Sequence, residues 1–417
     1  MAHGRVREPV HEFRSTPPIA FCLLVLPYGM SAGFVSVTLP FALTRAEFPV
    51  AMTASIVALG LSANVWRFIW GPLADLTLTL RRWYAIGAAM CAVSLLLLSV
   101  MPLREGSLLP LVVFLSQVAA TFVVLPVGGL MAHTVADQEK GRAGGWYQAG
   151  NLGGTGLGGG AGVWLTDHFS IQLAGVVLSA AMMICLAALY VVPPVRGGEG
   201  ERLGEKMSEM GRDFRDMLRA PVVLLTLVLV MSPIGIGAAS NLWAAVAPTW
   251  RATPNTVAVF TGTLSGLVSA AGCVVGGSVA DRLGRWWAFF GSGTLIALVA
   301  LVMVVAPRTS GMYSSGVLFY AFSLGISNAA FSAIVLHIIG RGAASAKYAI
   351  VSSLGNVPFV YMTWFDGWMH DRSGVVGMLV GEAVLGMAGV VLGLVAVWKI
   401  SRVAVPMPDK TAVGIGA

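Results

Sequence analysis

The side chain in the most unusual position is Arg67, which lies inside the apolar run 51–73. A guanidinium group binds a carboxylate or a phosphate through two parallel hydrogen bonds. An arginine in apolar surroundings is costly unless it has a partner or water. Its position therefore indicates anion binding or gating, or else a structural pair with an acidic side chain or with backbone carbonyl groups.

A pattern that begins with glycine and ends with aspartate occurs in both halves of the chain. Residues 71–75 read GPLAD and residues 277–281 read GSVAD, and basic residues follow each copy. Glycine lets helices approach closely, and an aspartate can cap a neighbouring helix N-terminus and pair with basic side chains. The pattern predicts parts of a gate rather than solute ligands. Its residues are Gly71, Asp75, Arg81, Arg82, Gly277, Asp281, Arg282, Gly284 and Arg285.

Four further titratable residues stand inside apolar runs or at their ends, namely His133, His337, Asp366 and Glu382. Histidine titrates near physiological pH, and acids in apolar runs mark proton relays. These residues are therefore candidates for proton coupling. The alternatives are interfacial or capping histidines, an interfacial Asp366 near the end of its run, and a Glu382 that only pairs helices.

No pattern typical of catalysis, ATP hydrolysis or metal binding occurs in the sequence. Residues 154–159 match GxGxxG, but they lie inside an apolar run rather than after a strand of a soluble domain. The glycines of residues 150–162 instead predict a helix that packs closely on its neighbours. Each of the four cysteines lies alone in an apolar run and is expected to be a small buried side chain. We therefore expect no enzyme activity, no cofactor and no metal.

The composition identifies the medium in which these residues act. Of the 417 residues, 57% are hydrophobic and only 11% are charged, and the mean hydropathy is +0.81. Soluble domains carry about 25% charged residues. The chain is therefore expected to be an integral membrane protein. The net charge of +7 does not indicate nucleic-acid binding, because the basic residues fall in short loops instead of on one face.

The apolar runs predict an all-α membrane protein, because a helix crosses the bilayer in about 20 apolar residues. We expect twelve spans, over residues 19–42, 51–73, 83–102, 108–133, 144–166, 171–193, 220–247, 256–280, 286–306, 312–340, 346–369 and 374–399.

The lysines and arginines predict the orientation of these spans. Most of the 26 fall in the two tails and in every second loop. The opposite loops hold only Arg45, Arg104, Arg251, Arg308 and Arg372. Basic loops stay in the cytoplasm, so both termini are expected there. The expected parts are a tail 1–18, a six-helix half 19–194, a linker helix or loop 195–219, a six-helix half 220–400 and a tail 401–417.

The doubled gate pattern resembles the cytoplasmic loop motif of the major facilitator superfamily. Residues 66–75, WRFIWGPLAD, are similar to a signature of AmpG-type muropeptide permeases and their acetyl-CoA-transporter and siderophore-importer relatives. Residues 139–143, 346–355 and 366–368 also resemble parts of that branch, whereas residues 123–133 lack the acidic residues usual there. The resemblance covers the whole chain.

This resemblance implies two six-helix pseudo-repeats that rock about a central site. It implies a monomer in the bacterial inner membrane that imports an anionic or amphipathic solute with protons. The solute would be muropeptide-, acyl-CoA- or siderophore-like. The alternatives are an exporter of drugs or metabolites with the same fold, and a sensor or assembly factor that transports nothing.

In this architecture spans 1, 4, 7 and 10 line the cavity, and their polar residues, with others from spans 2, 5 and 11, predict a polar, cationic pocket. Each amide has the alternative of hydrogen-bonding between helices only. The candidate binding residues are Arg67, Asn64, Tyr28, Gln117, Gln148, Asn151, Asn241, Trp243, Asn328 and Asn356.

Overall fold

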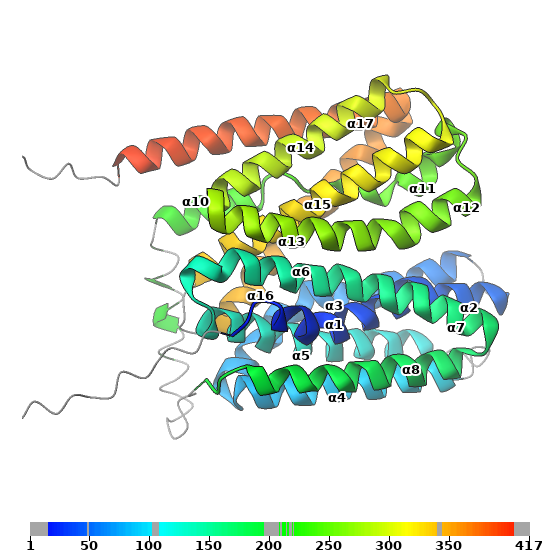
Figure 1. Cartoon of the computed structure of the whole chain (residues 1–417), viewed down its shortest axis with the longest axis vertical. Helices are drawn as coiled ribbons and strands as arrows, with labels where there is room; N and C mark the ends of the chain where they lie inside the picture. Colours follow the sequence, from blue (N-terminus) through cyan, green and yellow to red (C-terminus); the bar gives the residue numbers. More distant parts are fainter. Residues whose placement is uncertain are drawn as a thin grey trace, which may run out of the picture.

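A computed structural model describes residues 16–47, 50–101, 108–195, 221–339 and 344–403, with short pieces between 208 and 219. Every regular element in these ranges is helical. The helices run roughly side by side as a bundle of two groups, one from each half of the chain (Figure 1). The groups meet where α6 of the first half packs against α13 and α15 of the second.

The first half is built from helices that follow the predicted spans. Several of these helices contain or end in a short π-helical or 3-10 segment, labelled η. They are α1 (Ala20–Gly33), η1 (Phe34–Thr38), α2 (Leu39–Arg45), α3 (Val50–Leu76), α4 (Leu80–Val100), α5 (Leu109–Thr134), η3 (Asp137–Glu139), α6 (Lys140–Gly156), η4 (Leu157–Ala161), α7 (Gly162–His168), α8 (Ile171–Ile184) and η5 (Cys185–Val191).

The second half contains the longest helices and the most broken stretch. Its elements are α10 (Pro221–Val230), η6 (Ala238–Asn241), α11 (Trp243–Val246), η7 (Ala247–Trp250), α12 (Pro254–Thr256), η8 (Val257–Leu264), α13 (Ser265–Leu283), α14 (Arg285–Val305), α15 (Ser310–Ile339), α16 (Ala344–Leu354) and α17 (Val357–Val403).

Eight helices in the described residues are long and apolar enough to cross a membrane. One of them, Ala346–Trp398, contains two of the predicted spans, and α17 is broken between these at Gly374, whose φ is +62°. The prediction of an all-α, multi-span protein is confirmed. The count of twelve and the side of the termini stay predictions. The tails and most of the linker 195–219 lie outside the described residues, although Asp213 pairs with Lys347 at 3.5 Å.

The prediction of one continuous span over 220–247 is wrong. The helix α10 ends at Val230, and the chain then runs without helical structure to Gly237. Pro233 cannot donate a backbone hydrogen bond, and Gly235 and Gly237 take left-handed φ values of +65° and +66°. Residues with this geometry cannot continue a helix. The run contains Ser232, Pro233, Gly235 and Gly237, which are signals for such a break.

The glycines of α6 let this helix pack closely against helices of both halves. A Cβ atom at Gly150 would lie 2.2 Å from the carbonyl oxygen of Cys22 in α1. A side chain at Gly145 would lie 2.5 Å from the carbonyl oxygen of Cys273 in α13. No Cβ atom is tolerated at such distances, so the glycine-rich segment packs helices, as predicted, and places α6 between the two halves.

Candidate functional site

A cavity of about 450 Å³ lies between the halves and is lined by both of them. Its wall comes from α1, α3 and α6 on one side and from the 230–240 stretch, α14, α15, α16 and α17 on the other. Seven of the predicted binding residues line it. They are Tyr28, Asn64, Arg67, Gln148, Asn151, Asn328 and Asn356.

The polar residues of the cavity are linked to one another. The Tyr28 hydroxyl donates to Asn64 Oδ1 at 2.8 Å, which joins α1 to α3. Gln148 Nε2 in α6 donates to the Ser332 hydroxyl in α15 at 3.0 Å, and Asn151 donates to Gln148 at 3.2 Å. These amides therefore hydrogen-bond between helices and also line the cavity. The two alternatives that the sequence left open apply to the same residues.

Arg67 lies in α3 and is 7% exposed. Its Nε atom has no hydrogen-bond partner, and no carboxylate of the described residues lies within ion-pair distance. The tyrosines Tyr28, Tyr147 and Tyr348 lie close enough to interact electrostatically with the guanidinium group. The part of the chain that is described thus offers this charge aromatic hydroxyl neighbours but no acid.

Three predicted binding residues lie elsewhere. Gln117 is buried and donates to the Ser31 hydroxyl at 3.0 Å, so it ties α5 to α1. Asn241 is exposed and donates to Thr363 at 2.8 Å. Trp243 packs among Trp250, Tyr313 and Tyr320. Asn241 and Trp243 do not line the cavity, because η6 and α11 do not continue the helix α10 after the break at Val230.

Sequence reasoning missed several cavity residues, namely Tyr147, Tyr348, Ser327, Ser352, Phe289 and Phe331. A signal for some of them was present. Tyr348 and Ser352 stand at intervals of four residues before Asn356, and Ser327 is adjacent to Asn328. Side chains three or four residues apart share a helix face, so the faces of the predicted amides already contained these neighbours.

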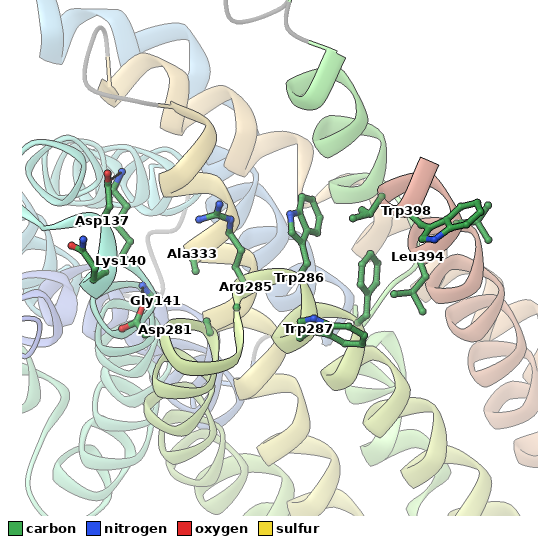
Figure 2. Close-up of a pocket in the computed structure, with 16 residues that line it drawn as sticks. Asp137, Lys140, Gly141, Asp281, Arg285, Trp286, Trp287, Ala333, Leu394 and Trp398 are labelled. Atoms are coloured by element: carbon green, nitrogen blue, oxygen red, sulfur yellow. Dashed lines mark hydrogen bonds and ion pairs between the residues drawn. The ribbon is translucent and has the colours of Figure 1, made fainter. Parts of the chain in front are cut away.

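Asp281 joins the two halves at one end of the bundle (Figure 2). Its carboxylate accepts hydrogen bonds from the backbone N–H groups of Gly141 at 2.6 Å and Arg142 at 2.8 Å, and from Arg142 Nε at 3.3 Å. These N–H groups are at the N-terminus of α6, where a negative charge is stabilised. We call this contact between Asp281, Gly141 and Arg142 the latch.

The other predicted gate residues have different roles. Asp281 pairs with Arg142 of the opposite half at 3.3 Å. Arg282 is exposed, Gly284 turns the chain with a φ of +96°, and Arg285 contacts His337 at 3.0 Å.

In the first copy of the motif, Gly71 is buried and Arg81 donates to the Leu189 carbonyl at 3.2 Å. The backbone N–H of Arg82 donates to the Thr79 hydroxyl, which caps this helix. The Asp75 side chain lies outside the described residues.

The predicted proton-coupling residues fall into two kinds of surroundings. His133 contacts the Gly129 carbonyl of its own helix at 2.8 Å, and His337 contacts Arg285. Asp366 is 0% exposed and Glu382 is 5% exposed. Both acids are enclosed by helices, because the break at Gly374 folds the second arm of α17 back beside the first.

A larger hollow of about 830 Å³ lies beside the latch and is the view of Figure 2. Beyond Asp281 and Arg285 its wall is formed by Trp286, Trp287 and Trp398. Trp287 and Trp398 are 69% and 52% exposed, which is usual for side chains that face lipid. The smaller cavity, which contains Arg67 and the amides, is therefore the candidate site.

The comparisons with known proteins agree with this architecture. The sequence profile described as Major Facilitator Superfamily matches residues 19–361. No curated protein sequence gives a significant match. Two solved structures illustrate the similarity of fold. The human organic anion transporter MFSD10 (TETRAN) has a TM-score of 0.61 at 14% identity, covering 90% of this chain and 100% of that one.

The second structure is the proton:xylose symporter XylE bound to 6-bromo-6-deoxy-D-glucose. Its TM-score is 0.66 at 12% identity, covering 92% of this chain and 95% of that one. Identities this low bear on the fold alone. The family match extends over most of the chain, from the first helix through α16 and into α17. The chain therefore belongs to the major facilitator superfamily and is a multi-span secondary transporter, not an enzyme.

Proposed function

We propose that this transporter moves an organic anion through the central cavity and that Arg67 holds the anionic group. The observation that carries the proposal is a buried guanidinium on the cavity wall with no acidic partner among the described residues. A desolvated charge without a partner is costly. A carboxylate or phosphate on the solute relieves that cost and gains bidentate hydrogen bonds.

The rest of the wall favours a solute that is partly polar and partly apolar. Tyr28, Asn151 and Asn356 offer hydrogen-bonding groups, whereas Phe289 and Phe331 offer apolar surface. The volume of about 450 Å³ lies in the range of small-molecule sites. These features, with the resemblance of residues 66–75 to AmpG-type permeases, support an amphipathic anion of the muropeptide, acyl-CoA or siderophore type, or a smaller carboxylate.

Alternating access supplies the mechanism. The latch closes one end of the space between the halves, and α6 and α13 are in contact there. The bias of lysine and arginine supports placing this end, with both tails and the linker, in the cytoplasm. We infer that the protein acts as a monomer in a bacterial inner membrane. In this account it imports the anion with protons, and opening of the latch releases the anion into the cell.

A thermal-shift screen on the purified protein tests the solute class. The panel contains muropeptides, acyl-CoA species, siderophores and small carboxylates, with lipophilic cations and neutral drugs as the contrast. A ligand that binds only the folded state at 100 times its Kd stabilises it by about 2.7 kcal/mol, so anions are expected to raise the melting temperature. If cations or neutral drugs raise it and anions do not, the anion proposal fails and an exporter of drugs is favoured.

A further inference from the structure

Two buried acidic side chains lie inside the second half, and neither of them lines the solute cavity. Asp366 and Glu382 lie on the two arms of α17 that are separated by the break at Gly374. They are 0% and 5% exposed, and the arms pack together beside them, because a Cβ atom at Gly381 would lie 2.9 Å from the Phe365 ring. Buried acids are rare in membrane-embedded helices and are functional candidates by default.

The hydrogen bonds of the pair are incomplete. Glu382 Oε1 accepts from the Tyr320 hydroxyl at 2.6 Å and from the Ala239 backbone N–H at 3.2 Å. Within the described residues, Glu382 Oε2 and both carboxyl oxygens of Asp366 have no hydrogen-bond partner. Three buried acceptor atoms without a donor are costly, and a proton bound to either carboxyl turns one of these acceptors into a donor.

No positive charge offsets the pair within the described residues. Tyr320 of α15 is the titratable group that faces it, and residues 238–250 contain no charged side chain. In α14 the one basic residue is Arg285, at the latch end.

The nearby charged groups of α17 itself are His370, Asp371 and Arg372, which are exposed or half-exposed. Arg372 stacks on Trp368. Arg308 is held by Trp250 and by the carbonyls of Met303 and Val304.

We propose that Asp366 and Glu382 are a proton-binding pair that couples protonation to the broken stretch 231–241. Two buried carboxylates on neighbouring helix arms in a low-dielectric interior cannot both be ionised at low cost. The pair therefore holds a proton while it is closed from water. Binding forms one O–H bond from a carboxylate oxygen and a proton supplied by water, release breaks it, and nothing is oxidised or reduced.

The coupling runs through the backbone of η6. Glu382 holds the Ala239 N–H group on one side of this stretch, and Gly235, Ile236 and Ser240 line the solute cavity on the other. The left-handed glycines Gly235 and Gly237 give the stretch two hinge positions. A movement that admits water to the pair and releases its proton therefore also moves the cavity wall. This rests on the proposed function, because it supplies the proton site for the coupled import.

Infrared spectroscopy of the purified protein without solute tests the pair directly. A protonated carboxyl group has a carbonyl stretch that a carboxylate lacks. At neutral pH we expect this band in the wild type, and expect it to be weakened in Asp366→Asn and in Glu382→Gln. Asp371→Asn, on the same helix but exposed, is the matched control and is expected to leave the band unchanged. A wild-type spectrum without a component that the two variants remove would overturn the proposal.

Hydrogen exchange in peptides over residues 231–241 tests the coupling. After correction for the intrinsic pH dependence, exchange in the wild type is expected to rise about tenfold in alkaline buffer, as ionisation opens the stretch. In Asp366→Asn only Glu382 can ionise and no second carboxylate repels it, so the rise is expected to disappear. An equal rise in both proteins would contradict the coupling. Both experiments use no solute, so they can succeed or fail independently of the anion proposal.

Discussion

Replacing Arg67 with alanine is expected to weaken binding of the anionic solute by about 100-fold or more. The guanidinium is nearly fully buried and has no acid among the described residues to hold it in place. Truncating one partner of a buried, hydrogen-bonded charge pair costs about 2–5 kcal/mol, and each 1.4 kcal/mol is a tenfold change in Kd. Isothermal titration with the best anion of the thermal-shift panel measures the change.

Two further variants make this result specific. Arg67→Lys keeps the charge but loses the bidentate geometry, so an intermediate loss is expected. Arg45→Ala removes an exposed arginine that pairs with Asp167 and is expected to bind as the wild type does. If Arg67→Ala binds the anion with wild-type affinity, Arg67 has a structural role only, and the account of the cavity is wrong.

Replacing Asp281 with alanine is expected to open the latch. The change removes an acceptor for two backbone N–H groups at the α6 N-terminus and for Arg142. Loss of a helix cap costs about 1 kcal/mol, and loss of a charged hydrogen bond costs about 1.5–3 kcal/mol. Together these costs are expected to shift the balance between closed and open forms at this end by about 60-fold or more.

The native Cys273 provides the measurement. It is 0% exposed and lies where α13 meets Gly145 of α6, so separation of the halves uncovers it. In a protein with Cys22, Cys91 and Cys185 changed to alanine, the rate of alkylation of Cys273 is expected to rise by about the same factor in Asp281→Ala. Asp137→Asn, an exposed acid that pairs with Lys140 within one half, is the matched control. Equal rates in all three proteins would show that the latch does not hold this end closed.

Much of the candidate site could be predicted from the sequence, because polar side chains in apolar runs are few. Arg67, Asn151 and Asn356 stood out for that reason, and the cavity contains all three. The periodicity of the helices also carried information about Tyr348 and Ser352. Gln117 could not be excluded, because an amide that faces a neighbouring helix and one that faces a cavity look the same in the sequence.

The contacts that depend on how distant segments meet could not be predicted. The pairing of Asp281 with Arg142 requires α13 and α6 to lie together, and no local pattern records this. The break after Val230 had a local signal in Pro233, Gly235 and Gly237, but the apolar residues around it favoured one span. Asp366 was a proton-coupling candidate with an interfacial position as the alternative, and its burial depends on the fold of α17 at Gly374.

Uptake into liposomes that contain the purified protein measures proton-driven transport of an organic anion through the cavity that contains Arg67. The anion is the one that gives the largest thermal shift. With the outside made acidic, wild-type liposomes are expected to accumulate the anion, and liposomes with Arg67→Ala are expected to match protein-free ones. Accumulation that is the same with and without the pH gradient, or the same in both proteins, would contradict the account.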